Sequence, residues 1–291
     1  MTATPSRPRR SALYMPATNA KALAKARSLP CDIVILDLED AVAPDAKDEA
    51  RAAAIAAVNE GGFGHREVAI RANAIDSEWG MADLAAIAGS KADAVLVPKV
   101  GSTQDIGRYE EALEAAPASM QLWAMIETCE AVFNLEPIAA LAASTRLSLW
   151  VMGTNDLAKE MRAQLTPCRT PFLPFFSFAV AAARLHGLTI LDGVCNEFRD
   201  LEVFEAESRQ ALMFGFDGKS LIHPAQVEPC NAVFSPGEAE LAWARNVIAA
   251  FQLPENQGKG VIRVDGKMTE LLHLEQAQRL VAVAEQIASM N

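Results

Sequence analysis

Two carboxylic acids closely follow apolar runs in this sequence. Glu127 comes directly after the run 121–126, and Asp156 comes four positions after the end of the run 147–152. Short apolar runs of this kind are typical of strands that are buried on both faces of a parallel sheet. A carboxylate at the end of such a strand needs a cation or a proton, because burying an unpaired charge is costly.

The spacing of these acids favours a shared cation. They lie 29 positions apart (156 − 127), and a strand, a crossover helix and the next parallel strand take about 30 residues. Both acids would then face one cleft. One or two carboxylates, completed by substrate and water oxygens, are the usual protein ligands of Mg²⁺. The alternative is a pair of acids that only cap loops.

The elements that must position these acids alternate along the chain. Apolar strand patterns cover 12–15, 32–38, 67–71, 94–97, 121–126, 147–152, 189–191 and 220–222, and helical patterns cover 18–28 (capped by Thr18 or Asn19), 44–59, 81–88, 103–115, 135–143, 171–185 and 199–213. Eight such units predict a (β/α)₈ barrel with a parallel sheet, a fold that suits a chain of 291 residues.

Polar side chains gather where the predicted strands end. They are Glu39, Asp40, Arg71, Lys99, Glu127, Asp156, Asp192 and His223. In a barrel these positions share the C-terminal rim, where active sites form. Helix caps would explain Asp, Ser and Thr there, but not the cations Arg71 and Lys99. The clustering therefore indicates an enzyme.

The composition narrows the classes of partner. The net charge of −11 argues against nucleic acid or an anionic membrane as a partner. No apolar run approaches the roughly 20 residues of a membrane span. Five cysteines without C-x-x-C spacing, and no recognisable signal peptide, favour reduced thiols and a cytoplasmic protein. The first ten residues, with Arg7, Arg9 and Arg10, are expected to form a frayed tail.

A C-terminal extension follows the eight barrel units. We expect the barrel, with the metal site, to occupy 1–235, and the extension to occupy 236–291. Its pattern is a helix at 238–250, a linker at 254–260, a hairpin at 261–264 with Asp265-Gly266, and a helix at 271–288. An extension this apolar must pack on the barrel wall or on another subunit.

Several stretches together resemble the citrate lyase beta subunit, or HpcH/HpaI aldolase, superfamily. They are 10–16 (RSALYMP), 36–42 (LDLEDAV), 70–73 (IRAN), 98–99 (PK), 125–127 (MIE) and 215–224 (GFDGKSLIHP). The resemblance runs over nearly the whole chain, in order. The tail stretch 264–268 (VDGKM) resembles the branch of malyl-CoA and citramalyl-CoA lyases.

The resemblance implies roles for particular residues. Glu127 and Asp156 match Mg²⁺ ligands (Mn²⁺ could replace it), and Arg71 matches the arginine that binds the carboxylate and oxygen of the substrate. Glu39 and Asp40 would hold metal-bound waters, which makes Asp40 a further catalytic candidate. Contacts to the substrate or to its CoA portion are implied for Tyr14, Lys21, Lys25, Glu127, Ile222 and His223. Lys21 and Lys25 lie four apart on one helix face, where they could clamp phosphates or simply face solvent.

The chain departs from the family pattern at two places. Pro16-Ala17 stands where Pro-Gly is usual. The tail motif, typically Gly-Lys-Met-Ile-Asp, reads here as 266–270 (GKMTE). In the CoA lyases that aspartate reaches a neighbouring subunit's site as an acid/base. Glu270 keeps the carboxyl group but adds a methylene, and Asp265 is a weaker candidate for the same role.

These observations lead to an expected function with two alternatives. We expect a Mg²⁺-dependent lyase that cleaves malyl-CoA, methylmalyl-CoA or citramalyl-CoA to a 2-oxo acid and an acyl-CoA, working as a homotrimer or a multiple of it. One alternative is a (3S)-malyl-CoA thioesterase that uses the same site, with Glu270 steering water to the thioester. The other is a non-catalytic acyl-CoA or nucleotide-binding barrel. The sequence does not select the acyl group or the physiological direction.

Overall fold

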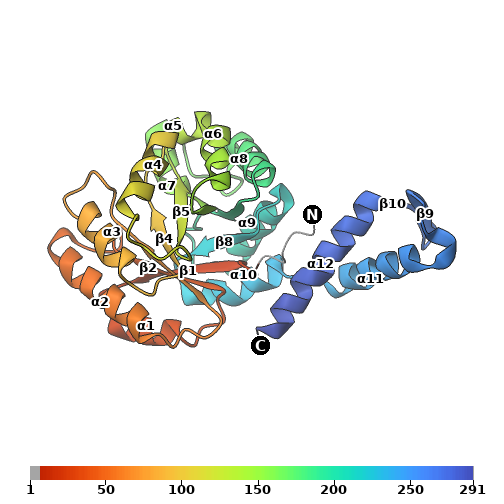
Figure 1. Ribbon diagram of the computed structural model, residues 1–291, viewed down its shortest axis with the longest axis horizontal. Coiled ribbons are helices and arrows are strands. Elements are labelled where there is room, and N and C mark those ends of the chain that lie inside the picture. The colour runs from red at the N-terminus through yellow and green to blue at the C-terminus, as the bar shows by residue number, and fades with distance from the viewer. Residues whose placement is uncertain (1–6, 291) are drawn as a thin grey trace. The chain divides into compact units, whose positions relative to one another are not determined.

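Eight parallel strands close into a barrel with helices around it, which confirms the predicted (β/α)₈ fold (Figure 1). The computed structural model describes residues 7–290. Each strand pairs with the next, and β1 closes the barrel by pairing with β8. The strands are β1 (Ser11–Pro16), β2 (Ile33–Asp37), β3 (Glu67–Arg71), β4 (Ala94–Val97), β5 (Gln121–Ile126), β6 (Leu147–Met152), β7 (Thr189–Asp192) and β8 (Gly218–Leu221).

The barrel helices lie where the sequence predicts them, with three additions. They are α1 (Ala20–Ala26), α2 (Lys47–Glu60), α3 (Gly80–Ala88), α4 (Thr103–Ala112), α5 (Cys129–Phe133), α6 (Leu135–Ala140), α7 (Thr154–Met161), α8 (Leu173–Leu185), α9 (Leu201–Phe214) and α10 (Val227–Phe234). The additions are α5, α7 and α10, each of eight residues or fewer. Within residues 7–290, none of the helices combines the length and apolar character that a bilayer crossing requires.

Side chains from the strands fill the interior of the barrel, so it is a packed core and not a pore. Aliphatic residues from β2, β4 and β6 meet Trp123 and Met125 from β5 there. Tyr14 packs against this cluster from β1.

Arg9 closes the barrel at the N-terminal ends of the strands. Its guanidinium donates to both oxygens of Glu67, at 2.7 and 2.8 Å, and to Thr189 and Gln121 at 3.0 Å each. Arg10 likewise pairs with Asp32. The expected frayed tail is therefore wrong for these two arginines, because buried carboxylates bind them. Residues 1–6 of that tail lie outside the described residues.

The C-terminal extension is a compact unit of its own, separate from the unit Arg9–Phe234. Helix α11 (Glu238–Gln252) is followed by the strands β9 (Val261–Val264) and β10 (Lys267–Glu270) and by helix α12 (Leu271–Ser289). The predicted hairpin is present, and its turn residues Asp265 and Gly266 have φ of 49° and 78°. Turns with two positive φ angles match the twist of paired strands.

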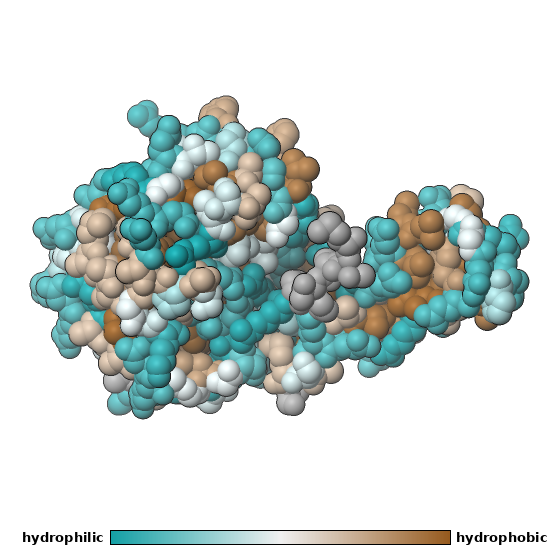
Figure 2. Space-filling model, viewed as in Figure 1, coloured by the Kyte–Doolittle hydropathy of each residue, from teal (hydrophilic) through white to brown (hydrophobic). Residues whose placement is uncertain are grey.

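This unit has a small core and an apolar surface. Ala244, Val247, Ile262, Val264 and Ala277 form the buried cluster. Apolar side chains are also exposed along the hairpin and the start of α12, and they are visible as brown atoms on this unit in Figure 2. The exposed ones are Val261, Met268, Leu271 and Leu272. Packing of this surface on a partner stays a prediction.

Candidate functional site

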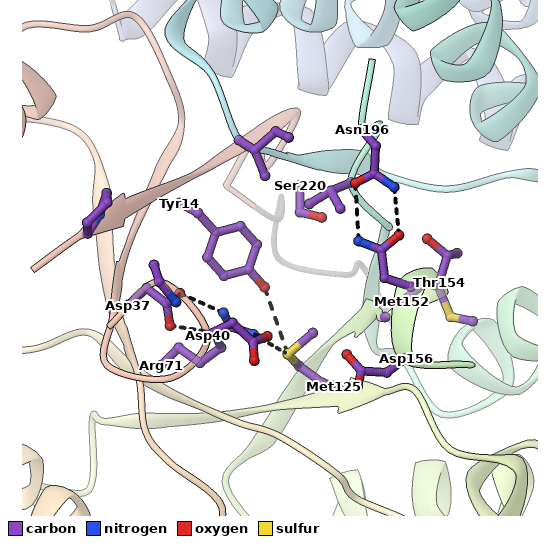
Figure 3. A pocket seen from close by; sticks show the side chains of 16 residues that line it. Tyr14, Asp37, Asp40, Arg71, Met125, Met152, Thr154, Asp156, Asn196 and Ser220 are labelled. Atoms are coloured by element: carbon purple, nitrogen blue, oxygen red, sulfur yellow. Dashed lines mark hydrogen bonds and ion pairs between the residues drawn. The ribbon is translucent and has the colours of Figure 1, made fainter. Parts of the chain in front are cut away.

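A cavity of about 330 Å³ opens at the C-terminal ends of the strands. Figure 3 shows Asp37, Asp40 and Arg71 on one side of it and Thr154 and Asp156 on the other. Its lining residues are Tyr14, Pro16, Asp37, Asp40, Ala41, Arg71, Met125, Met152, Gly153, Thr154, Asn155, Asp156, Val194, Asn196, Ser220 and Ile222. The cavity thus gathers Tyr14, Asp40, Arg71, Asp156 and Ile222 from the predicted site residues.

Arg71 is fixed in place by the neighbouring strand. It ends β3 opposite Asp37, which ends β2, so the pairing of the two strands brings the side chains together. The guanidinium forks onto Asp37, with Nε 2.7 Å from Oδ1 and Nη2 2.6 Å from Oδ2. Nη1 lies 2.8 Å from Glu39 and 3.1 Å from Asp40. The planar fork of Arg71 is therefore used on Asp37, and its Nη1 edge, which pairs with Glu39 and Asp40, faces the cavity.

Tyr14 and Glu39 complete this side of the site. The guanidinium carbon of Arg71 lies 4.9 Å from the centre of the Tyr14 ring, a cation–π contact that steadies the charge. Burial raises the pKa of the Tyr14 phenol, so the hydroxyl stays protonated. Burial also raises the pKa of Glu39 to about 8, with the nearby Glu127 and Asp40 adding to the effect and Arg71 opposing it. A carboxyl group of this pKa can give or take a proton near neutral pH.

The two acids predicted to share a cation are joined by Lys99. Glu127 directly follows β5, and Asp156 stands in the first turn of α7. The backbone N–H of Lys99 donates to Glu127 Oε1 at 2.8 Å, and its ammonium Nζ lies 3.4 Å from the same oxygen. The ammonium is also ion-paired with Asp156 Oδ1. A positive charge thus bridges the two carboxylates.

Glu127 is held in a space that the backbone leaves open. Its side chain is 1% exposed, and its Oε2 is buried without a hydrogen-bond partner. Burial raises its pKa, while the Lys99 charge and backbone N–H lower it. A Cβ on Gly153 would come within 2.4 Å of Glu127 Cβ and Oε2. Only glycine at position 153 lets this carboxylate occupy its place.

The arrangement fits a hard divalent cation. Glu127 Oε2 is an unsatisfied buried oxygen, and Asp156 lies across the lysine bridge from it with a third of its side chain exposed. Among residues 7–290, no three His, Cys, Asp or Glu side chains gather into a metal cage. Two carboxylates that leave the other positions to water and substrate suit Mg²⁺, which keeps several waters in proteins.

The residues expected to contact CoA are only partly gathered. Ile222 lines the cavity and is 41% exposed. His223 follows it, with its ring stacked on Phe198 at 5.0 Å and its Nδ1 accepting from the Ala225 N–H. Lys21 and Lys25 are exposed on α1 and do not line the cavity. Their roles stay predictions.

The remaining rim acids have other surroundings. Asp192 is fully buried between Lys219 Nζ at 2.6 Å and Arg169 Nη1 at 2.7 Å, so it serves the structure of β7 and β8. Glu270 lies in the C-terminal unit at the start of α12, where its backbone N–H donates to His273 Nδ1 at 3.0 Å. Its role stays a prediction.

The structure adds site residues that the sequence analysis gave no role. Asp37 orients Arg71, and a signal for it existed, because an aspartate inside an apolar strand needs a cation. Asn155 and Asn196 join their amides across the cavity, at 2.9 and 3.2 Å. They come from positions 41 residues apart, and nothing in the sequence pairs them.

Comparisons with known proteins extend over the whole chain. Residues 10–224 match the family model described as HpcH/HpaI aldolase/citrate lyase. A (3S)-malyl-CoA thioesterase of Cereibacter sphaeroides is 48% identical over 284 residues, covering 98% of this chain and 97% of that protein. An L-malyl-CoA/beta-methylmalyl-CoA lyase of the same organism is 32% identical over 313 residues, with 98% and 97% covered.

A solved structure agrees with these sequence matches. The protein CitE from Mycobacterium tuberculosis, in complex with magnesium, acetoacetate and coenzyme A, superposes with a TM-score of 0.76. It is 28% identical and covers 96% of this chain and 98% of that one.

Proposed function

Because the chain belongs to the HpcH/HpaI aldolase/citrate lyase family, we propose that it is an enzyme of CoA thioesters that hydrolyses (3S)-malyl-CoA to malate and free CoA. The reaction consumes one water, breaks the bond between the acyl carbon and sulfur, and leaves the carbon skeleton intact. This places the thioesterase alternative ahead of the lyase that the sequence analysis favoured.

The observation that carries the proposal is the difference between the two groups of relatives. Identity to the thioesterase is 48% and identity to the lyase is 32%, each over 98% of this chain. The departure of the tail at Thr269-Glu270 from the Ile-Asp of the CoA lyases points the same way, because the acid/base there has changed in length. Thioesterase and lyase chemistry can share a binding site and differ in which bond is attacked.

The acyl group would be held between Arg71 and the acid pair. The Nη1 edge of Arg71, oriented by Asp37 and steadied by Tyr14, can donate to the malyl carboxylate in place of Asp40. Asp40 is 69% exposed and can move aside. Glu127 and Asp156 would hold Mg²⁺, which, when bound, orients the hydroxyl and carboxylate of the substrate and stabilises developing negative charge.

A carboxyl group must direct water at the thioester carbon. We assign this to Glu270 of a neighbouring copy, which implies a homo-oligomer, a trimer or a multiple of it. Such an acid/base contributes about 10²–10⁴-fold to a rate. Glu39 lies beside Arg71, and its pKa of about 8 suits it to accept and pass on a proton near neutral pH. All five cysteines are free thiols, which suits the proposed cytoplasmic location.

The products of a single incubation test the proposal. The protein is mixed with malyl-CoA and Mg²⁺, and acyl-CoA species, free CoA, malate and glyoxylate are read by mass spectrometry. We expect equal amounts of malate and free CoA, and no turnover without the divalent cation. Methylmalyl-CoA and citramalyl-CoA serve as competing substrates.

The second candidate is the C–C lyase, which the 32% relative supports. It predicts glyoxylate and acetyl-CoA in equal amounts, without malate. A barrel that binds CoA thioesters without catalysis would leave malyl-CoA unchanged while still protecting the protein against thermal unfolding.

A further inference from the structure

We propose that the ammonium of Lys99 competes with the divalent cation for Glu127 and Asp156, and that it leaves the two carboxylates when the cation binds. Lys99 would then be a positioning residue that sets metal affinity. The inference rests on the metal site proposed above and concerns how Lys99 affects the affinity of that site for the cation.

The backbone of Lys99 is shaped for this position. Lys99 comes two residues after the end of β4, with φ of 56°, one of four non-glycine residues with positive φ among residues 7–290. The left-handed region is unfavourable for residues with a Cβ and persists where the surroundings impose it. Here it aims the backbone N–H at Glu127 Oε1, 2.8 Å away, and returns the side chain to the same oxygen.

The charges explain why the ammonium sits there. Glu127 and Asp156 would repel each other if both were ionised with nothing between them. Nζ contacts both, and the two carboxylates raise the pKa of Lys99 although its burial lowers it. A single positive charge therefore links the two carboxylates.

A divalent cation bound to Glu127 Oε2 and Asp156 would lie close to the ammonium, which contacts Glu127 Oε1 and Asp156 Oδ1. Mg²⁺ binds carboxylate oxygens at about 2.0–2.1 Å, so it would lie only a few ångströms from Nζ and repel it. The side chain of Lys99 is 40% exposed, which leaves it a route towards solvent. Its backbone N–H can stay on Glu127 Oε1 while the side chain departs. The backbone contact thus keeps Glu127 in place, while the Lys99 side chain moves away from the metal.

Metal affinity tests this directly. Mn²⁺ binding to protein stripped with EDTA is measured by calorimetry at pH 8, for the wild type and for Lys99→Met. Loss of the competing charge should lower the Kd by about tenfold, a contact worth about 1.4 kcal/mol at a partly exposed site. Lys99→Arg keeps the charge and should not tighten binding.

A matched control separates the bridge from general charge. Lys159 is an exposed lysine on α7, the helix that carries Asp156. Lys159→Met removes the same charge without breaking the bridge, so its Kd should stay within about twofold of the wild type. A Lys99→Met variant that binds Mn²⁺ no tighter than the Lys159→Met variant overturns the inference.

Mn²⁺ binding by the wild type tests the proposed metal site itself. If neither the wild type nor Lys99→Met binds Mn²⁺, the proposed metal site is wrong, and the inference falls with it. If the wild type binds and Asp156→Asn does not, the metal site stands, and the comparison with Lys99→Met judges the inference alone.

Chemical labelling of the wild type gives a readout that needs no variant. The rate of lysine reductive methylation is followed residue by residue by mass spectrometry, with and without Mg²⁺. An ammonium released from two carboxylates should react faster, so labelling of Lys99 should rise with Mg²⁺ while Lys159 stays constant. Equal labelling of Lys99 in both conditions contradicts displacement.

Discussion

At the scale of single residues, Arg71 uses most of its hydrogen-bonding capacity inside the protein. Two of its three donor groups are bound by Asp37, whose side chain is 2% exposed. The third faces the cavity beside Asp40. This division explains how one guanidinium can be rigid and still meet a substrate, because the fork fixes its direction and Nη1 can exchange the exposed Asp40 for a substrate carboxylate.

Replacing Arg71 by lysine should therefore damage both stability and turnover. A lysine ammonium cannot satisfy both oxygens of Asp37, so we expect a loss of about 1–3 kcal/mol in the free energy of unfolding and a fall in kcat/KM of at least about 10²-fold. Urea denaturation and product assays measure the two. The control is Arg108→Lys, since Arg108 forks onto the exposed Asp76, where a change within about 0.5 kcal/mol is expected. Similar losses at both positions would contradict a special role for burial.

Glu39 should give the metal-free protein a pH-dependent stability. Its folded pKa of about 8 is above its usual value of 4.5, so the folded state holds the proton more tightly than the unfolded state. The stabilisation is full below pH 4.5 and is lost as the pH rises to 8. Urea denaturation at pH 5–9 with EDTA should show the wild type losing stability relative to Glu39→Gln over this range. Exposed Glu111 provides the control variant Glu111→Gln, and a constant difference at all pH values would count against the buried proton.

At the scale of elements, the site depends on how β5, β6 and α7 approach one another. Gly153 links β6 to α7 and faces Glu127, which follows β5. The limit here is steric rather than conformational, because φ of Gly153 is −100°. At Gly153 the link leaves room for the Glu127 carboxylate but not for a side chain at position 153 as well.

A methyl group at this link should close the metal site. In Gly153→Ala the new Cβ would meet Glu127 Oε2 at 2.4 Å, so the acid must move, and we expect Mn²⁺ affinity to fall by at least about tenfold. Gly107→Ala is the matched control. Position 107 lies inside α4 with no atom within 4 Å of the added Cβ, so this change should stabilise the protein by about 0.5–1 kcal/mol. Unchanged metal binding in Gly153→Ala would mean that the acid has another place to go.

The sequence predicts elements better than it predicts their partners. The bounds 67–71, 94–97, 121–126 and 147–152 agree with β3, β4, β5 and β6, because runs buried on both faces stand out by composition alone. The ion pairs depend on which strand ends meet in space. The bridge from Lys99 to Glu127 and Asp156 depends on a positive φ at Lys99, and the ion pair of Arg9 with Glu67 joins residues 58 positions apart. Local sequence patterns predict neither the bridge nor the ion pair.

At the scale of the whole molecule, the C-terminal unit combines a small core with exposed apolar side chains. Its buried core consists of five small or medium side chains, with larger, partly buried ones such as Trp243 and Phe251 packed against them. Met268, Leu271 and Leu272 are about half exposed or more. A unit of this size gains little stability from its own core. Burial of this surface on a second copy would bring Glu270, which stands beside Leu271, into an interface.

Mixed oligomers test whether Glu270 serves a neighbouring site. Arg71→Ala and Glu270→Ala should each be inactive alone. Mixing them under conditions of subunit exchange should restore part of the activity, because some sites would then combine an intact Arg71 with an intact Glu270. Exchange is verified by native mass spectrometry with isotope-labelled chains. Proven exchange without any activity would place the carboxyl group within its own chain or outside catalysis.

The pairing of β1 with β8 sets the timing of barrel assembly. Ser11 pairs with Lys219, so the contact that closes the ring spans 208 positions (219 − 11). Contacts at such separations form slowly, because a long loop must be ordered before the pairing stabilises it. During synthesis β1 must wait, with an unpaired edge, until β8 has left the ribosome. Nascent chains that stall before residue 218 should therefore be the species that aggregate and that chaperones hold.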